Sequence, residues 1–178
     1  MHLFPIRRSF IYFFFYPFCR KKLIHFKTSL KKAKHFLVLL PRDIEIIDAE
    51  KTIAPIIRLF PQSKLVLFQS ENQKKNNQAP VNQTFSTANQ KNIKIIHFID
   101  YKSLDQLNQY QFDVLLDLDP NSHFLNLYLC SLLKTTIRIA FQKSYGFFYY
   151  NLLYKGKPDI LYQKQLKGLY HSLQRLLQ

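Results

Sequence analysis

The stretch FDVLLDLDPNSHFLNLYLC, residues 112–130, decides the fold. Its first half is an apolar run that ends on an acidic pair and a proline, at Asp117, Asp119 and Pro120. A polar Asn-Ser step follows, and apolar residues then recur at the spacing of a helix. We therefore expect a strand, a polar corner and a helix, the kind of junction at which open α/β folds bind their ligands.

The same alternation repeats along the chain. Short continuous apolar runs, rich in β-forming residues, predict strands over 35–41, 64–68, 93–99, 112–119 and 135–141. Helical spacing predicts helices over 44–60, 103–110, 122–134 and 163–178. Near-continuous hydrophobic strands between helices are typical of a parallel sheet covered on both faces. Right-handed crossovers then predict a doubly wound, flavodoxin- or Rossmann-like α/β fold, with a mostly parallel five-stranded sheet in the order 3-2-1-4-5.

Local signals add detail to this pattern. Pro55, inside the first long helical pattern, predicts a kink or a break into two shorter helices. Asn121 or Ser122 is expected to cap the helix that follows the fourth strand. Residues 69–92, rich in Asn, Gln and Lys, predict a long surface loop. Aromatic residues in 144–154 are expected to cover a sheet edge or to form a dimer contact.

The positive charge of the chain is unevenly placed. The 178 residues carry a formal net charge of +15, and residues 1–34 hold nine Lys or Arg residues and no acidic residue. The rest of the chain therefore carries only +6 of the +15. We predict a basic, aromatic N-terminal appendage over 1–34 and a single Rossmann-like α/β domain over 35–178.

The appendage combines an aromatic block with flanking cations. Residues 9–19, SFIYFFFYPFC, are too few to cross a hydrocarbon core, which needs roughly twenty residues. Pro17 inside this run, and the absence of a small-x-small cleavage site after it, argue against a signal peptide. Residues 20–35 predict a basic amphipathic helix. The pattern favours contact with a membrane surface, through Arg7, Arg8, Phe13, Phe14, Phe15, Arg20, Lys21 and Lys22.

Two alternatives to lipid contact remain for the appendage. In one, the aromatic run packs on the domain and the lysines form a solvated face. In the other, the cations contact nucleic acid, but such a surface would interleave aromatic rings with cations, whereas here the rings form one block. Nucleic acid is therefore the disfavoured partner, and we expect a cytoplasmic protein, peripheral on the inner face of the membrane.

Residue types that carry cofactor or metal chemistry are scarce. With only three glycines, neither GxGxxG nor GxxxxGK[ST] occurs in the chain. Cys19 and Cys130 have no CxxC partner, which suits a reducing compartment, and the six histidines show no metal-ligand spacing. We therefore expect no cofactor and no metal, and we expect Cys130 to be a core residue.

Two corners of the predicted sheet are expected to share a crevice. Ligands of such sheets bind beyond the carboxyl ends of the strands, near the switch in strand order. One corner follows the first strand and the other follows the fourth strand, and these strands are neighbours in the proposed order. The ligand-binding candidates are Arg42, Asp43, Asp117, Asp119, Asn121 and Ser122. The alternative for the two aspartates that end the fourth strand is that they cap the next helix or pair with a basic neighbour.

Several short motifs occur in a familiar order. They are Phe60-Pro61 after the first helix, Phe112-Asp113 at the opening of the fourth strand, Asp117-Leu118 near its end, and Arg138-Ile139-Ala140-Phe141 in the fifth strand. In this order they resemble the N-terminal Rossmann-like domain of the heptosyltransferase-like glycosyltransferases (family 9, GT-B). The resemblance covers roughly residues 35–155, and it implies the same fold.

The resemblance also implies how sugar transfer would be organised. In the family, the first corner carries a Gly-Asp pair whose Asp is implied to act as base on the acceptor hydroxyl. Ile44-Glu45 stands at that place here, so Glu45 is either the candidate general base or an ordinary acid in a first helical turn. In the family, a C-terminal half supplies most of the nucleotide-sugar site. This chain ends about where that half would start, so a complete transferase is not expected from it alone.

These observations predict a stand-alone glycosyltransferase-like domain, non-catalytic or partner-dependent, with a binding or scaffold role at the cytoplasmic membrane face. One alternative is a small or fragmentary glycosyltransferase that uses Glu45 as base. Another is an unrelated flavodoxin-like domain that binds a nucleotide or a protein. The expected partners are an anionic membrane surface, a glycan or nucleotide-sugar ligand, and a partner protein or a second copy of the chain.

Overall fold

The computed structural model describes residues 24–42, 46–70, 93–98, 107, 109–121, 123–143, 149–156 and 161–178. The helices are α2 (Phe26–Lys32), α3 (Ile46–Leu59), α5 (Phe124–Leu132) and α7 (Tyr162–Leu177). The strands are β1 (His35–Leu39), β2 (Lys64–Ser70), β3 (Ile93–Phe98), β4 (Val114–Asp117), β5 (Ile137–Phe141) and β6 (Leu152–Tyr154).

The strands form one parallel sheet in the order β3-β2-β1-β4-β5-β6. The predicted doubly wound α/β fold and the order 3-2-1-4-5 of its five strands are confirmed. A sixth strand, β6, lies beside β5 and comes from the aromatic segment that was expected to cover a sheet edge. At the centre of the sheet β1 pairs with both β2 and β4, so the switch in strand order lies at β1.

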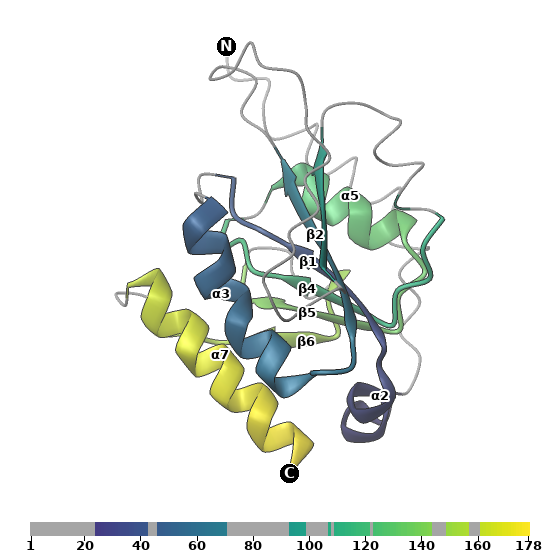
Figure 1. Ribbon diagram of the computed structural model, residues 1–178, viewed down its shortest axis with the longest axis vertical. Coiled ribbons are helices and arrows are strands. Elements are labelled where there is room, and N and C mark those ends of the chain that lie inside the picture. Colours follow the sequence, from purple (N-terminus) through teal and green to yellow (C-terminus); the bar gives the residue numbers. More distant parts are fainter. Residues whose placement is uncertain are drawn as a thin grey trace, which may run out of the picture.

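Both faces of the sheet are buried, which explains the continuous hydrophobic strands. In β1, Phe36 and Val38 belong to one core, Leu37 and Leu39 belong to the other, and all four are at most 1% exposed. Helices α2, α3 and α7 cover the first face, and α5 covers the second (Figure 1). A strand buried on both faces needs apolar residues at every position, so no polar alternation appears in its sequence.

Helix α3 runs unbroken through Pro55. The predicted break into two helices is therefore wrong. A proline inside a helix costs about 3 kcal/mol or more, but Ile53 and Ile56 on either side of Pro55 are both buried in the core between α3 and the sheet. Tyr170 of α7 adds a hydrogen bond from its hydroxyl to the Thr52 carbonyl oxygen, at 2.5 Å. Tertiary burial along the apolar face holds the two halves of the helix together.

The cap of α5 also differs from expectation. The helix begins at Phe124, and its N-cap is His123, which makes no side-chain cap hydrogen bond. Asn121 and Ser122 are thus not the cap residues. The backbone N–H of Asn121 instead donates to Asp119 Oδ1 at 2.8 Å, and this tight turn delays the start of the helix.

Helix α2 lies within the predicted basic amphipathic stretch and packs on the domain. Leu30 is fully buried in the core between the sheet and α7, while Lys27, Lys31 and Lys32 are exposed. Lys27 Nζ donates to the backbone oxygen of Gln178 at 2.7 Å, which joins α2 to the end of α7. Leu30 thus anchors the C-terminal part of the predicted appendage in the domain core.

Several predictions fall outside the described residues. They are the membrane-surface candidates Arg7, Arg8, Phe13, Phe14, Phe15, Arg20, Lys21 and Lys22, the site candidates Asp43, Glu45 and Ser122, and most of the loop over 69–92. For these residues the sequence-based expectations stay predictions.

Candidate functional site at the carboxyl edge of the sheet

The corners after β1 and β4 lie side by side, as predicted. Leu39 pairs with Asp117 across the two parallel strands, and the Leu118 N–H donates to the Leu39 carbonyl oxygen at 2.9 Å. From β2, the side-chain amide of Gln69 approaches the carbonyl oxygens of Pro41 and Arg42, at 3.4 and 3.3 Å. Three neighbouring strands therefore hold the two corners at one edge of the sheet.

Asp117 is the centre of a buried hydrogen-bond network at this edge. Its side chain has no exposed surface. Its Oδ1 accepts from the Asp119 backbone N–H at 3.0 Å and from Asn126 Nδ2 at 3.1 Å. Its Oδ2 accepts from Lys143 Nζ at 2.6 Å and from the Tyr150 hydroxyl. A buried carboxylate is tolerated when it is paired and hydrogen-bonded, and Asp117 meets both conditions.

The partners of Asp117 come from three different elements. Asn126 lies in the first turn of α5, Lys143 follows β5, and Tyr150 precedes β6. The Lys143 side chain is only 2% exposed, and its Nζ also lies 5.6 Å from the centre of the Tyr150 ring. Burial and the Asp117 charge raise the pKa of Tyr150 well above its ordinary value, so this hydroxyl stays protonated and can donate. The network thus fixes the ends of β4 and β5 relative to α5.

Asp119 and His123 form a second pair, closer to solvent. Asp119 Oδ2 lies 3.2 Å from His123 Nε2, and the aspartate side chain is 2% exposed while the histidine side chain is 28% exposed. Burial raises the pKa of Asp119, although the hydrogen bond from Asn121 and the nearby imidazole oppose this shift. A buried carboxylate that holds a partly exposed imidazole sets the ring orientation. Such a ring can hold a ligand by hydrogen bonding or move a proton.

Arg42 supplies an unsatisfied donor on the neighbouring corner. Among the described residues, its Nε is buried and has no hydrogen-bond partner. Leaving a buried donor unpaired costs about 1–3 kcal/mol, and a guanidinium is suited to carboxylate or phosphate oxygens. Arg42 is therefore the described residue of the first corner that carries an unsatisfied, charge-bearing donor group.

Tyr162, at the start of α7, contacts the corner after β4 from the face of the sheet that α7 covers. Its hydroxyl donates to the Leu118 carbonyl oxygen at 2.9 Å, and its ring meets Phe141 at 6.1 Å in an edge-on arrangement. Burial raises the pKa of Tyr162, so its hydroxyl serves as a donor. The helix that ends the chain is thereby tied to the corner after β4.

The structure brings four of the predicted ligand-binding residues to one edge, namely Arg42, Asp117, Asp119 and Asn121. The sequence-based prediction missed Lys143, Tyr150 and His123. Lys143 could have been found from the predicted order, because the end of the fifth strand neighbours the end of the fourth. His123 could have been found from its spacing of four residues after Asp119 at a strand-to-helix corner.

In the part of the chain that the structure describes, neither metal binding nor chemistry at a cysteine is supported. No group of three His, Cys, Asp or Glu side chains there is arranged to hold a metal ion. Burial raises the pKa of the Cys130 thiol to about 12, and the side chain has no exposed surface, so this cysteine is a core residue, as predicted, and not a thiolate nucleophile.

Membrane-crossing helices are a separate question. Among the described residues, no helix has both the length and the hydrophobicity that crossing a membrane requires.

Comparison with known proteins gives one informative match. No family model matches the chain, and no curated protein matches its sequence. Among solved structures, the chain is similar to the E. coli heptosyltransferase WaaC with ADP, with a TM-score of 0.51 and 9% sequence identity. The match covers 78% of this chain and 46% of the heptosyltransferase chain. The chain therefore shares the Rossmann-like α/β fold of part of that heptosyltransferase, as the sequence resemblance implied.

Proposed function

We propose that this chain is a glycosyltransferase-like domain that binds a glycan or nucleotide-sugar ligand at the carboxyl edge of its sheet, without transferring sugar by itself. The observation that carries the proposal is the side-by-side placement of the corners after β1 and β4. Arg42, whose buried Nε has no partner among the described residues, and the partly exposed imidazole of His123 lie at this edge together with the buried network of Asp117. A preorganised polar edge binds a ligand at a low cost in ordering its own side chains.

The buried carboxylates support binding more than turnover. A general base must come within hydrogen-bond reach of the hydroxyl that it deprotonates. Both oxygens of Asp117 are already occupied and its side chain has no exposed surface, and Asp119 is 1% exposed. These two acids therefore position other groups. The family resemblance implies a base at Glu45, and it implies a second half of the protein for the nucleotide-sugar.

The ligand test uses the full chain, labelled for NMR. ADP is the first probe, because the matching heptosyltransferase was solved with it; an ADP-sugar and free oligosaccharides follow. We expect saccharide-bearing probes to shift the resonances of Arg42 Nε and His123, and we expect Arg42→Gln to weaken binding by about tenfold, as for loss of a charge-assisted hydrogen bond. Lys51→Gln, on the exposed surface of α3, is the control. Shifts confined to other regions, or no shift with any probe, would contradict the proposal.

A second candidate function is sugar transfer by this domain, and the Asp119–His123 pair favours it. An imidazole can serve as a general base, and this one is partly exposed at the carboxyl edge of the sheet. The test compares Glu45→Gln and His123→Gln with the unaltered chain, in the presence of an ADP-sugar and an acceptor glycan. Loss of transfer in either variant, with the fold intact, would assign the base. If the unaltered chain transfers no sugar, the binding role is favoured. If the ligand test shows binding of nucleotides but of no saccharide, the flavodoxin-like alternative is favoured.

We also propose that the basic N-terminus holds the domain at a membrane surface. The support is the aromatic block with its flanking Arg7, Arg8, Arg20, Lys21 and Lys22. Because Leu30 of α2 is part of the core, the deletion that tests this removes residues 1–23 and leaves α2 in place. We expect the shortened chain to leave anionic vesicles that retain the full chain, and equal retention would contradict the role.

A further inference from the structure

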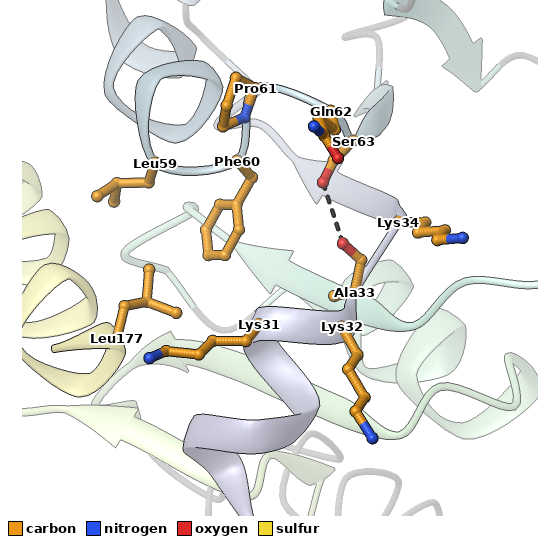
Figure 2. Close-up of a pocket in the computed structure, with 10 residues that line it drawn as sticks. All are labelled: Lys31, Lys32, Ala33, Lys34, Leu59, Phe60, Pro61, Gln62, Ser63 and Leu177. Atoms are coloured by element: carbon orange, nitrogen blue, oxygen red, sulfur yellow. Dashed lines mark hydrogen bonds between the residues drawn. The ribbon is translucent and has the colours of Figure 1, made fainter.

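A groove lies at the opposite edge of the sheet, where the strands begin. Its volume is about 830 Å³. The end of α2, the turn between α3 and β2, and the last turn of α7 line it (Figure 2). Since β1 and β2 start here and run in parallel, this groove is separated from the candidate ligand site by the full length of the strands.

The walls of the groove are held in place by the fold. Ser63 Oγ donates to the Ala33 carbonyl oxygen at 3.1 Å, and the Lys64 N–H donates to the Lys34 carbonyl oxygen at 2.7 Å. Behind them, the Phe60 ring packs on Phe36 with 4.6 Å between ring centres. The α2 end and the α3–β2 turn are thus joined directly, and the fold itself shapes the groove.

The rim of the groove is strongly cationic. Lys31, Lys32 and Lys34 all line it and are exposed. No acidic side chain is among its described lining residues, and none of the three lysines pairs with a described acid. The acid beside them, Asp113, turns its carboxylate to the backbone N–H groups of Lys34 and His35, at 2.8 and 3.0 Å. The lysine charges are therefore available to an external anion.

One side of the groove is apolar. Leu59, Phe60 and Leu177 also line the groove, on the side away from Lys34 (Figure 2). Leu59 and Leu177 are partly exposed, and Phe60 is 8% exposed. A groove that combines exposed cations with an apolar side is complementary to an amphiphile with a negative headgroup.

The directions in which the three lysines point favour binding to a surface of many anions over binding to a single anion. In Figure 2, Lys31 extends toward Leu177, whereas Lys32 and Lys34 point away from it and from each other. One phosphate could not meet all three ammonium groups, but a layer of headgroups could. Nucleic acid would need exposed rings for stacking, and the aromatic ring in this groove is largely buried.

We infer that this groove is a docking surface for an anionic phospholipid bilayer, with Lys31, Lys32 and Lys34 on the headgroup phosphates. The inference rests on the proposed attachment to a membrane surface and gives it an orientation. The lysines continue the basic stretch that begins at Arg20-Lys21-Lys22, so both parts would meet the same bilayer. The edge with the candidate ligand site then faces away from the lipid, toward soluble ligands and partners.

The test measures vesicle binding of the full chain and of a triple variant, Lys31→Gln, Lys32→Gln and Lys34→Gln. The vesicles contain phosphatidylglycerol and phosphatidylcholine, or phosphatidylcholine alone. Each lysine near an anionic surface contributes roughly fivefold to binding, so the triple variant should lose on the order of a hundredfold on anionic vesicles. Unaltered binding by the triple variant would overturn the inference.

A matched control removes three exposed lysines elsewhere, with Lys51→Gln, Lys164→Gln and Lys167→Gln. It carries the same change in net charge, and it should lose only a few-fold in binding. An equal loss in both triple variants would mean that net charge alone acts, and it would overturn the docking surface. Thermal unfolding of each variant checks that the fold is kept.

Further probes separate the sources of negative charge. Inorganic phosphate and single-stranded DNA should bind the groove much more weakly than anionic vesicles do, and tighter binding of either at these lysines would overturn the inference. If deletion of residues 1–23 releases the chain but the triple variant stays bound, the groove inference fails while membrane attachment stands. If neither change reduces binding, both fail. Ligand binding at the other edge, measured separately, is independent of these outcomes.

Discussion

The two edges of the sheet use their charges in opposite ways. At the carboxyl edge, Asp117 and Lys143 are buried against each other and almost no part of either side chain reaches solvent. At the amino edge, Lys31, Lys32 and Lys34 are exposed and meet no described acid. A buried pair holds its surroundings in one geometry, whereas exposed like charges create a field that acts on large anionic surfaces. The first arrangement suits a shaped ligand site and the second suits a lipid surface.

The largest effect should come from removing one charge from the buried pair. Lys143→Gln leaves the Asp117 carboxylate without its cation, and we expect the free energy of unfolding to fall by about 3–5 kcal/mol. Lys31→Gln at the other edge should change it by less than about 0.5 kcal/mol. Urea unfolding of both variants measures the contrast, and similar losses in the two would contradict the comparison of the edges.

A second substitution tests whether α2, which carries the exposed Lys31 and Lys32, is part of the core. Leu30 of α2 has no exposed surface, and Leu30→Ala should lower the free energy of unfolding by about 2–5 kcal/mol through the lost burial and the cavity. Leu132 of α5 is 38% exposed, so Leu132→Ala is the control and should cost much less. If Leu30→Ala is harmless in urea unfolding, α2 is not part of the core and the amino edge is not preformed.

A milder change weakens the carboxyl edge without removing a charge. Tyr150→Phe deletes the hydroxyl that donates to Asp117 Oδ2, while Lys143 remains beside the same oxygen. We expect a loss of about 1–3 kcal/mol in the free energy of unfolding. We also expect weaker binding of any saccharide ligand, because the corner after β4 is less well held. A variant as stable as the unaltered chain would show that the hydroxyl is dispensable to the network.

The smallest effect is a dependence on pH. Because burial raises the pKa of Asp119 above its ordinary value of 3.8, the folded chain holds this proton more tightly than the unfolded chain. The contribution of Asp119 to stability therefore falls as the pH rises from about 3.8 through the raised pKa. Asp119→Asn cannot ionise, so its stability should rise relative to the unaltered chain across that window. Urea unfolding at a series of pH values measures the difference, and a constant difference would contradict the raised pKa.

Much of the fold followed from the local pattern of the chain, with two instructive exceptions. The five predicted strands are apolar at nearly every position, and this pattern arises where a strand is covered on both faces. Strand β6 has only three residues and sits in an aromatic segment, so no periodicity marked it as a strand. Pro55 predicted a kink or a break, but the helix is continuous, because the burial of Ile53 and Ile56 outweighed the local cost of a break.

Part of the candidate site could also be predicted from the local pattern of the chain. Arg42, Asp117, Asp119 and Asn121 all lie at the carboxyl end of a strand or within four residues after it, so the strand order alone was enough to gather them. His123 was considered only as a metal ligand, and its use of Asp119 as a partner was missed. The cationic groove was not anticipated either, because Lys34 and the α3–β2 turn are distant in sequence and meet only through the pairing of β1 with β2.

The amino-acid sequence by itself determined the five long strands, their parallel order and the concentration of cations near the N-terminus, since hydrophobic periodicity and charge are local properties. Only the tertiary structure decided that Asp117 would meet Tyr150, 33 residues away, and that Lys143 would be buried with them. The physical reason is that a buried charge takes its partners from whatever elements pack around it. That packing depends on side-chain shape and on hydrogen bonding in three dimensions, which the spacing of residues along the chain does not record.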